Sequence, residues 1–265
     1  MTDPNNPSRI EVRSYFVRER NALLTRANFE PLYVDHYLHL MELKQQIDPV
    51  LDAVLKDAYG AFVLCLASRP LSEVSSWTLS FQDPLFNVFV TGDSRQENVI
   101  GRVFTENIKP RENNLMISQV RDAVTEVRQS MVEFEGMDVF RIVETFFRQS
   151  EQRPARLFRY AEEEFVCLTA QPDCDLDWLE ALDEDDIRAL DQDEALSLLE
   201  TRHYRFHCGC SIERLFPTFA SFSTDALDDL YQEDEVLQIQ CPRCGARYAM
   251  SRESLEAYLL SREAK

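Results

Sequence analysis

Glycine is scarce in this sequence, which has six glycines in 265 residues. None of them belongs to a GxGxxG or GxxxxGK loop, the loops that bind nucleotide phosphates through backbone amides, so nothing suggests a nucleotide. Gly/Ser-rich tracts and internal repeats are also absent. The chain has four histidines, and they do not support a specific Ser-His-Asp arrangement.

Positive charge is also in short supply. Lys and Arg number 28 against 47 Asp and Glu, which gives a formal net charge of −19. Binding to nucleic acid or to an anionic membrane surface requires basic residues, so we expect neither partner. The sequence lacks the run of about 18 apolar residues that a transmembrane helix needs, and its first residues do not resemble a secretory signal. We therefore expect a cytoplasmic protein, whose thiols stay reduced.

Hydrophobic periodicity predicts an α+β fold. Apolar residues recur at roughly helical spacing in residues 10–28 and 31–60, which we expect to be mostly helical. The period then changes to two in WTLSF and LFNVFVTG, which predicts a largely antiparallel sheet over residues 77–135. A helical stripe returns in residues 137–152. Together these segments predict an N-terminal antiparallel-sheet domain with helices, which we place at residues 1–172.

Three potential metal ligands lie on one predicted helix. His36 and His39 are one helical turn apart, and Glu42 follows one turn later. Such a trio could in principle share a metal ion, but no partner from elsewhere in the sequence is evident. We therefore interpret these side chains as ordinary surface residues.

An acidic segment follows the predicted sheet domain. Residues 173–200 contain twelve acids and one base, Arg188, so more than half of the net charge lies here. Like charges weaken helices, so a helical structure would have to be stabilised by docking. Two interpretations stay open: a solvated acidic linker, or a conditionally folded segment that sometimes exposes its apolar side. We place an acidic helical linker at residues 173–205 and, from the four cysteines described in the next paragraph, a small C-terminal zinc-binding domain at 206–265. The apolar residues near helical spacing are Leu176, Leu179, Leu182, Ile187 and Leu190.

Four of the seven cysteines form a Cys-x-Cys…Cys-x-x-Cys set, namely Cys208, Cys210, Cys241 and Cys244. Cysteines in a chain expected to be cytoplasmic indicate metal binding or redox chemistry. Four thiolates complete a tetrahedral Zn²⁺ shell and leave no position for water, so the predicted site is not hydrolytic. We expect the Cys-x-Cys half to be extended, because residues i and i+2 of an extended segment point the same way.

Gly209, between the first two cysteines, could also allow Cys208 and Cys210 to form a disulfide. Disulfide closure requires Cα atoms within about 7 Å, near the limit for extended residues two apart, and glycine allows the chain to fold inward. A strained bond of this kind is labile. The set could therefore be a zinc clamp when reduced and two local disulfides when oxidised. A zinc-stabilised interaction module without switching stays open, as does, less favourably, a thiol–disulfide oxidoreductase that uses CPRC.

The other three cysteines lie outside this set. Cys65 lies in the apolar run AFVLCLA and is expected to be a core residue. Cys167 and Cys174 could be peripheral redox thiols, although we favour no such role for them.

At these residues the sequence resembles the heat-shock protein 33 family of cytosolic redox-regulated chaperones. The segments CGCSIER (208–214) and CPRCGARY (241–248) are similar to the family's two cysteine motifs, with thirty residues between Cys210 and Cys241. A further segment, ETFFRQSEQRPARLF (144–158), resembles the family's Tyr-Phe-x-x-Ser-Glu-Gln-x-Pro pattern. The resemblance covers nearly the whole chain, but typical members have a glycine-rich sheet domain and this sequence does not.

The resemblance implies an ATP-independent holdase chaperone of the stress response, which is a binding protein and not an enzyme. In such a protein the reduced, zinc-bound form is inactive. Oxidation would pair Cys208 with Cys210 and Cys241 with Cys244, release the zinc, and unfold the C-terminal domain together with the adjoining linker. Apolar surface would then become available to unfolded client proteins. A homodimer of the activated protein is compatible with this behaviour.

Overall fold

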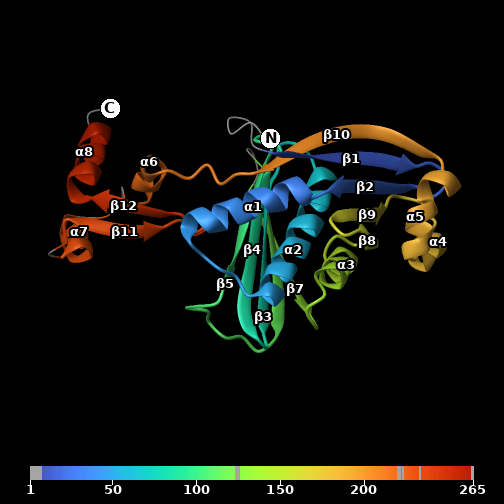
Figure 1. The fold of residues 1–265 in the computed structure, drawn as a ribbon, viewed down its shortest axis with the longest axis horizontal. Coiled ribbons are helices and arrows are strands. Elements are labelled where there is room, and N and C mark those ends of the chain that lie inside the picture. The colour runs from blue at the N-terminus through green and yellow to red at the C-terminus, as the bar shows by residue number, and fades with distance from the viewer. Residues whose placement is uncertain (1–7, 123–125, 220–221, 223, 233, 264–265) are drawn as a thin grey trace. The chain divides into compact units, whose positions relative to one another are not determined.

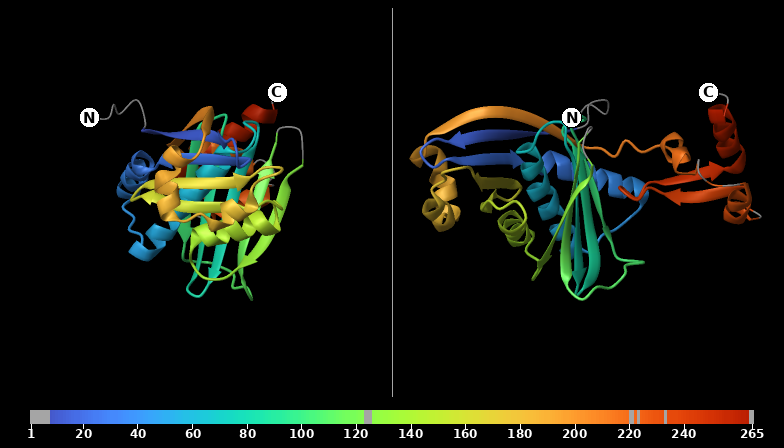
Figure 2. Two further views of the ribbon diagram at one scale, coloured as in Figure 1. Left: turned by 90° about the vertical axis from the view of Figure 1, so that its right-hand side faces the viewer. Right: turned by 180° about the vertical axis from the view of Figure 1, so that it is seen from behind.

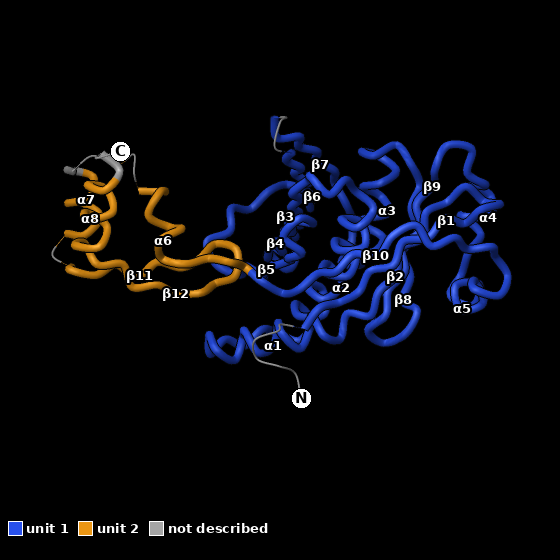
Figure 3. The backbone as a smooth tube through the Cα atoms, turned by 90° about the horizontal axis from the view of Figure 1, so that it is seen from above, with its two compact units in different colours: residues 1–207 blue, residues 208–265 orange. Residues whose placement is uncertain are grey.

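The structure is a computed structural model that describes residues 8–122, 126–219, 222, 224–232 and 234–263. The chain divides into two units, Met1–His207 and Cys208–Lys265 (Figure 3). Each unit has its own cluster of buried apolar residues. Within the described ranges, no helix combines the length and the apolar character needed to cross a membrane.

Unit 1 contains a ten-stranded sheet with two antiparallel halves, whose strands run in clearly different directions (Figures 1 and 2). One half has the order β7-β6-β3-β4-β5 and the other β10-β1-β2-β9-β8. The halves join where β5 and β10 run parallel over two residue pairs. The strands are β1 (Arg9–Val17), β2 (Ala22–Asn28), β3 (Val74–Gln82), β4 (Leu85–Asp93), β5 (Asn98–Phe104), β6 (Asn114–Arg121), β7 (Arg128–Phe134), β8 (Ala155–Ala161), β9 (Glu164–Ala170) and β10 (Leu196–Phe206).

The α+β class is confirmed, as is the antiparallel sheet expected over residues 77–135, of which residues 123–125 lie outside the described part. Helices α1 (Glu30–Leu43), α2 (Pro49–Ala67) and α3 (Val139–Gln149) also agree with the expected helical segments. Asp48 caps α2 by accepting hydrogen bonds from the amides of Val50 and Leu51. Helix α2 contacts β4 and β5 in one half of the sheet and β2 and β9 in the other. It therefore fills the core where the halves meet.

The helix expected over residues 10–28 is wrong, because these residues form the hairpin of β1 and β2. Along β1 the buried residues Ile10 and Val12 alternate with the exposed residues Glu11 and Arg13. This period of two suits a strand with one face in the core. The flanking strands β10 and β9 complete the pairing of the hairpin on both sides, which no local pattern reveals.

The acidic segment is helical only in its first part. Helices α4 (Leu176–Ala181) and α5 (Glu184–Asp193) match the predicted helices, but the following residues form β10. Strand β10 pairs with β1 along its length, from Leu196 to Arg205. The residues before Cys208 therefore belong to the main sheet, and the first unit extends through His207.

Helices α4 and α5 dock on the sheet through four of the five predicted apolar residues. Leu179, Leu182, Ile187 and Leu190 are at most 5% exposed, whereas Leu176 is 44% exposed. The segment is therefore a docked part of unit 1 in this state, and not a solvated linker. The four residues pack in one cluster with Val17, Ala22, Leu24, Phe158, Val166, Leu168 and Ala170.

Arginine side chains of the sheet region neutralise part of the acidic segment. Arg20, in the turn between β1 and β2, bonds to Asp175 at 2.7 Å and to Glu194 at 3.0 Å. Arg26, on β2, bonds to Asp191 at 2.7 Å. These pairs join both ends of the α4–α5 segment to the hairpin of β1 and β2.

Arg156, on β8, anchors the C-terminal end of α4. Its guanidinium donates to the carbonyl oxygens of Leu179, Glu180 and Leu182, at 3.2, 2.6 and 2.9 Å. Carbonyls at a helix end have no partner within the helix. This single cation therefore satisfies three backbone acceptors that would otherwise have to be hydrated.

Unit 2 is built on the hairpin of β11 (Val236–Gln240) and β12 (Arg247–Ser251). The short elements α6 (Ile212–Leu215), η1 (Phe216–Phe219), α7 (Thr224–Tyr231) and α8 (Arg252–Glu263) accompany it. Among the described residues, its buried core cluster is confined to Phe216, Leu227, Tyr231, Met250 and Leu255. A core this small gives little hydrophobic stabilisation, so the unit depends on an additional source of stability.

The Arg156 anchor can be tested by replacing the cation with an apolar side chain of similar length. Arg156→Met should lower the free energy of opening of α4–α5 by about 1.5–3 kcal/mol, the usual contribution of hydrogen bonds to a charged group. Limited proteolysis within residues 176–193 measures this opening. The control is Arg188→Met, which removes only exposed ion pairs to Glu184 and Asp185 and should change the free energy by about 0.5 kcal/mol or less. Equal cleavage rates in both variants would contradict an anchoring role for Arg156.

Candidate metal centre

The four cysteines of the Cys-x-Cys…Cys-x-x-Cys set meet at one end of the unit 2 hairpin. Cys241 directly follows β11, Cys244 lies in the turn before β12, and Cys208 and Cys210 precede α6. Their four Sγ atoms all lie within 4.8 Å of one another. The Sγ atoms of Cys208 and Cys241 are 3.7 Å apart, and those of Cys210 and Cys244 are 3.5 Å apart. The cluster could therefore hold one metal ion.

Gly209 shapes the Cys-x-Cys half differently from the expected extended form. Its φ is +64°, in the left-handed region, where a residue with a Cβ atom incurs a cost of about 1–2 kcal/mol. The backbone at Gly209 therefore departs from the extended form expected between Cys208 and Cys210. Glycine is needed here already in the reduced cluster, whether or not a disulfide later forms.

The residues after Cys210 support the backbone around Gly209. Ser211 is the N-cap of α6, and its hydroxyl accepts from the amide of Arg214 at 3.4 Å. The guanidinium of Arg214 donates to the carbonyl oxygen of Gly209 at 2.7 Å. The hydroxyl of Ser211 also lowers the pKa of the Glu213 carboxyl by hydrogen bonding. The Ser-x-Glu-Arg part of the motif is thus explained by its support of this backbone.

The Cys-x-x-Cys half is a tight turn between β11 and β12. The amide of Cys241 donates to the carbonyl oxygen of Ala246 at 2.7 Å, and the amide of Gly245 donates to the carbonyl oxygen of Cys241 at 2.9 Å. These bonds fix the backbone on both sides of Cys244. The hairpin therefore presents two thiols toward the other pair without any contribution from a long loop.

Tyr248 is a supporting residue whose role the sequence did not reveal. Its side chain projects from β12, and its hydroxyl lies 3.0 Å from Sγ of Cys210 and donates to the carbonyl oxygen of Cys210 at 3.0 Å. Burial and the neighbouring Cys210 raise the pKa of Tyr248, so the phenol stays a donor. Tyr248 is the last residue of the CPRCGARY segment, but only the fold shows that it contacts Cys210.

Three of the clustered thiols, those of Cys208, Cys241 and Cys244, shift one another's pKa. Hydrogen bonds from Cys208 and Cys244 lower the pKa of Cys241 well below the usual thiol range. The bond with Cys241 raises the pKa of Cys208 to about 12, and the pKa of Cys244 is also raised, first by Cys208. One thiolate is therefore favoured, while further ionisation is opposed by the negative charge already present. A bound cation would remove this conflict, because it stabilises all four thiolates together.

The histidines of α1 do not make a second metal site. His36 is 2% exposed, so the expectation of a surface residue is wrong for it. Its ring packs edge-on against Tyr59 and Phe206, and its Nε2 atom lies 3.4 Å from Asp52. Within the described residues, His36 and His39 are not part of any group of three potential metal ligands.

The other cysteines also have defined places. Cys65 is buried in the core of unit 1, as predicted, and is 2% exposed. Cys167 is 1% exposed, so it is not a peripheral thiol. Cys174, which precedes α4, is partly exposed.

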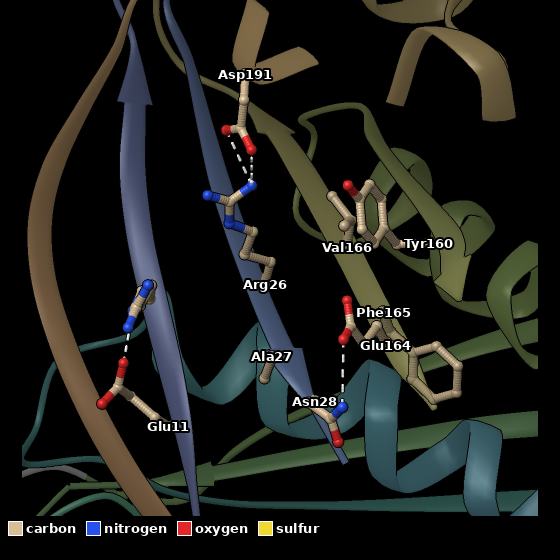
Figure 4. Close-up of a pocket in the computed structure, with 10 residues that line it drawn as sticks. Glu11, Arg26, Ala27, Asn28, Tyr160, Glu164, Phe165, Val166 and Asp191 are labelled. Carbon is tan, nitrogen blue, oxygen red and sulfur yellow. Dashed lines mark hydrogen bonds and ion pairs between the residues drawn. The ribbon is translucent and has the colours of Figure 1, made fainter. Parts of the chain in front are cut away.

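A pocket in unit 1 lies where α5 meets β1, β2 and β9 (Figure 4). Its polar groups largely satisfy one another. Arg26 faces Asp191 across the pocket, and Asn28 donates to Glu164 at 3.3 Å. We therefore interpret this pocket as part of the contact between α5 and the sheet, and not as a ligand site.

Comparison with known proteins places this site in a family. The model of the family described as Hsp33 protein matches residues 160–251, which include α4, α5 and all four clustered cysteines. The 33 kDa chaperonin of Proteus mirabilis is 24% identical over 261 residues, covering 83% of this chain and 87% of that protein. These comparisons support a divergent member of the Hsp33 family, at low identity.

Further comparisons agree with this family at low identity. The 33 kDa chaperonins of Edwardsiella ictaluri and Nitrosococcus oceani are 27% and 24% identical over 55% and 48% of this chain. The alignments span only 58% and 52% of those two relatives. A crystal structure of the 33 kDa chaperonin (HSP33 homolog) of Thermotoga maritima superposes with a TM-score of 0.72 over 98% of this chain and 100% of that one, at 12% identity. The Hsp33 fold is therefore retained across extensive sequence change.

The contact between Tyr248 and Cys210 predicts a measurable effect on metal binding. Tyr248→Phe keeps the ring and removes the hydroxyl, so it should lower metal affinity about 10–100-fold, as loss of a group that orients a metal ligand does in other sites. A competition titration of the reduced protein with a chelating dye measures the affinity. Tyr258→Phe is the control, because the ring of Tyr258 packs on Phe216 away from the thiols. If both variants keep the wild-type affinity, Tyr248 has no role at the metal.

Proposed function

We propose that this chain is a redox-regulated, ATP-independent holdase chaperone that binds unfolded proteins and is not an enzyme. The observation that carries the proposal is the cluster of four reduced thiols in a small unit. This unit follows directly after β10 and the docked acidic segment. Membership of the Hsp33 family supports the same function.

We propose that Cys208, Cys210, Cys241 and Cys244 bind one Zn²⁺ in the reduced protein. Four sulfurs at 2.3 Å from a tetrahedral zinc lie about 3.8 Å apart, which the cluster approaches without rearrangement. A shell of four thiolates leaves no open position, so the metal would be structural. Zinc binding contributes on the order of 10–16 kcal/mol in small metal-folded peptides. That amount exceeds what the small core of unit 2 offers, so metal loss would unfold the unit.

Oxidation by a peroxide would consume the ligands of the metal. Each disulfide forms from two thiols and one hydrogen peroxide, and two water molecules are released. The proposed pairs are Cys208 with Cys210 and Cys241 with Cys244. In the folded cluster short sulfur contacts cross between the two motifs, but in an unfolded chain short loops close more readily than long ones. Pairing within each motif therefore implies that unit 2 opens before the second bond forms.

We propose that unfolding of unit 2 affects unit 1 through β10, the strand that connects α5 to the cysteine cluster. Strand β10 begins after α5 and ends at Phe206, just before the metal cluster. Unfolding of unit 2 would remove the ordered segment that follows β10, and β10 could then separate from β1. Release of α4–α5 would expose the apolar side chains of β1, β2 and β9 beneath them. The acidic charge of the released segment would oppose aggregation of the open form.

Helix α1 offers apolar surface in the closed form as well. Val34, Leu38 and Met41 lie one helical turn apart and are 46%, 52% and 72% exposed. Large exposed apolar groups of this kind suit contact with unfolded chains. We therefore include this face of α1 in the proposed client-binding surface.

The function is tested by exposing the full-length reduced protein to hydrogen peroxide. We expect release of one zinc per chain, loss of four thiols, disulfides within each motif, and new suppression of aggregation of a chemically unfolded test protein. Cys174→Ser should behave like the wild type, because Cys174 lies outside the cluster. Cys208→Ser should bind zinc weakly, because it removes one of the four ligands.

Other outcomes would point to other functions. Zinc release without any gain in aggregation suppression would support a zinc-stabilised interaction module. Catalytic turnover of a small disulfide substrate would support an oxidoreductase. Purification under reducing conditions with no bound zinc would contradict the metal site itself.

A further inference from the structure

We propose that Cys65 and Cys167 form a second oxidisable thiol pair, buried in the core of unit 1. A peroxide would close this pair to a disulfide between α2 and β9 when the two elements transiently separate. The inference concerns unit 1 alone and does not require the metal cluster of unit 2.

The two thiols come from distant parts of the sequence and meet in the core. Cys65 lies near the end of α2 and Cys167 in the middle of β9, and they are 2% and 1% exposed. The hydroxyl of Thr25 lies beside the carbonyl oxygens of Leu64 and Cys167, which makes Cys65 and Cys167 neighbours in the core, and neither is in a disulfide in this structure. Neighbouring thiols on two packed elements can reach bonding distance when those elements shift.

An unusually close approach of α2 to β9 makes the two cysteines neighbours. A Cβ atom at Gly60 would lie 2.0 Å from a ring carbon of Phe165, so the helix backbone rests directly on that ring. The hydroxyl of Thr25 lies 3.3 Å from the carbonyl oxygen of Leu64 and 3.4 Å from that of Cys167. One side chain of β2 thus joins the backbones of α2 and β9 beside the two thiols. The pair is held by packing on both sides.

The same burial protects the pair while unit 1 is closed. Burial raises the pKa of Cys65, and the neighbouring Cys167 raises it further. The thiolate is the form that reacts with peroxide, so the closed core reacts slowly at neutral pH. Opening of the helix–strand contact would admit both water and oxidant.

The oxidation proceeds in two balanced steps. One thiol reduces hydrogen peroxide to water and becomes a sulfenic acid. The second thiol then attacks that sulfur, the S–S bond forms, and a second water leaves. The product would close a loop of about one hundred residues, a length for which a disulfide strongly restricts the unfolded chain. It would therefore hold α2 on the sheet under oxidising conditions.

The test uses the full-length Cys174→Ala variant, because trypsin leaves Cys167 and Cys174 in one peptide, 160–188. The protein is treated with hydrogen peroxide at room temperature and a few degrees below its unfolding midpoint, then alkylated and digested without reductant. Mass spectrometry should find peptide 57–95, which contains Cys65 because trypsin does not cleave before Pro70, joined to peptide 160–188 only after treatment at the higher temperature. Calorimetry of the treated sample should show a melting temperature for unit 1 several degrees higher than before treatment.

Matched variants complete the test. Cys65→Ala and Cys167→Ala, each combined with Cys174→Ala, should give neither the cross-linked peptide nor the rise in melting temperature. Alkylated or sulfinic Cys65 and Cys167 without a cross-link would overturn the proposal. Equal cross-linking at both temperatures would contradict the claim that burial protects Cys65 and Cys167 from peroxide in the closed protein. These measurements use peptides of unit 1 only. Their outcome therefore does not depend on whether the zinc-release or chaperone assays succeed.

Discussion

The acidic segment can stay folded only while it is docked on the sheet. Helices as short as α4 and α5 are unstable by themselves in water, and the acidic side chains of this segment repel one another. Burial of four apolar side chains and the contacts of Arg20, Arg26 and Arg156 oppose that repulsion. The segment is therefore folded by its surroundings, which makes it the part of unit 1 best suited to conditional release.

Unit 2 has the same dependence on an outside source of stability. Its small core is supplemented by four thiols that could hold a metal ion, and Gly209 between two of them has a positive φ that favours glycine. Strand β10 connects these two conditional elements along the chain. A chemical change at the thiols thus has a short covalent route to the docked helices, whereas the core around α2 is built from extensive burial.

Local patterns in the sequence predicted the features that depend on local spacing. The cysteine set, the strands from residue 77 onward and four apolar contacts of the acidic helices are of this kind. The failures have a common physical cause. The strands β1, β2 and β10 depend on partners far away in the sequence, the positive φ of Gly209 depends on the folded cluster, and the closeness of Cys65 and Cys167 depends on the packing of α2. None of these leaves a periodic signal.

Amide hydrogen exchange of the full-length protein, before and after peroxide, tests most directly whether the thiols control the docked helices. The account predicts that amides of unit 2 and of residues 176–193 lose protection on oxidation, while those of β3 and β4 keep it. Reduction and return of zinc should restore the original pattern. Loss of protection in unit 2 alone, with α4 and α5 still protected, would contradict the account.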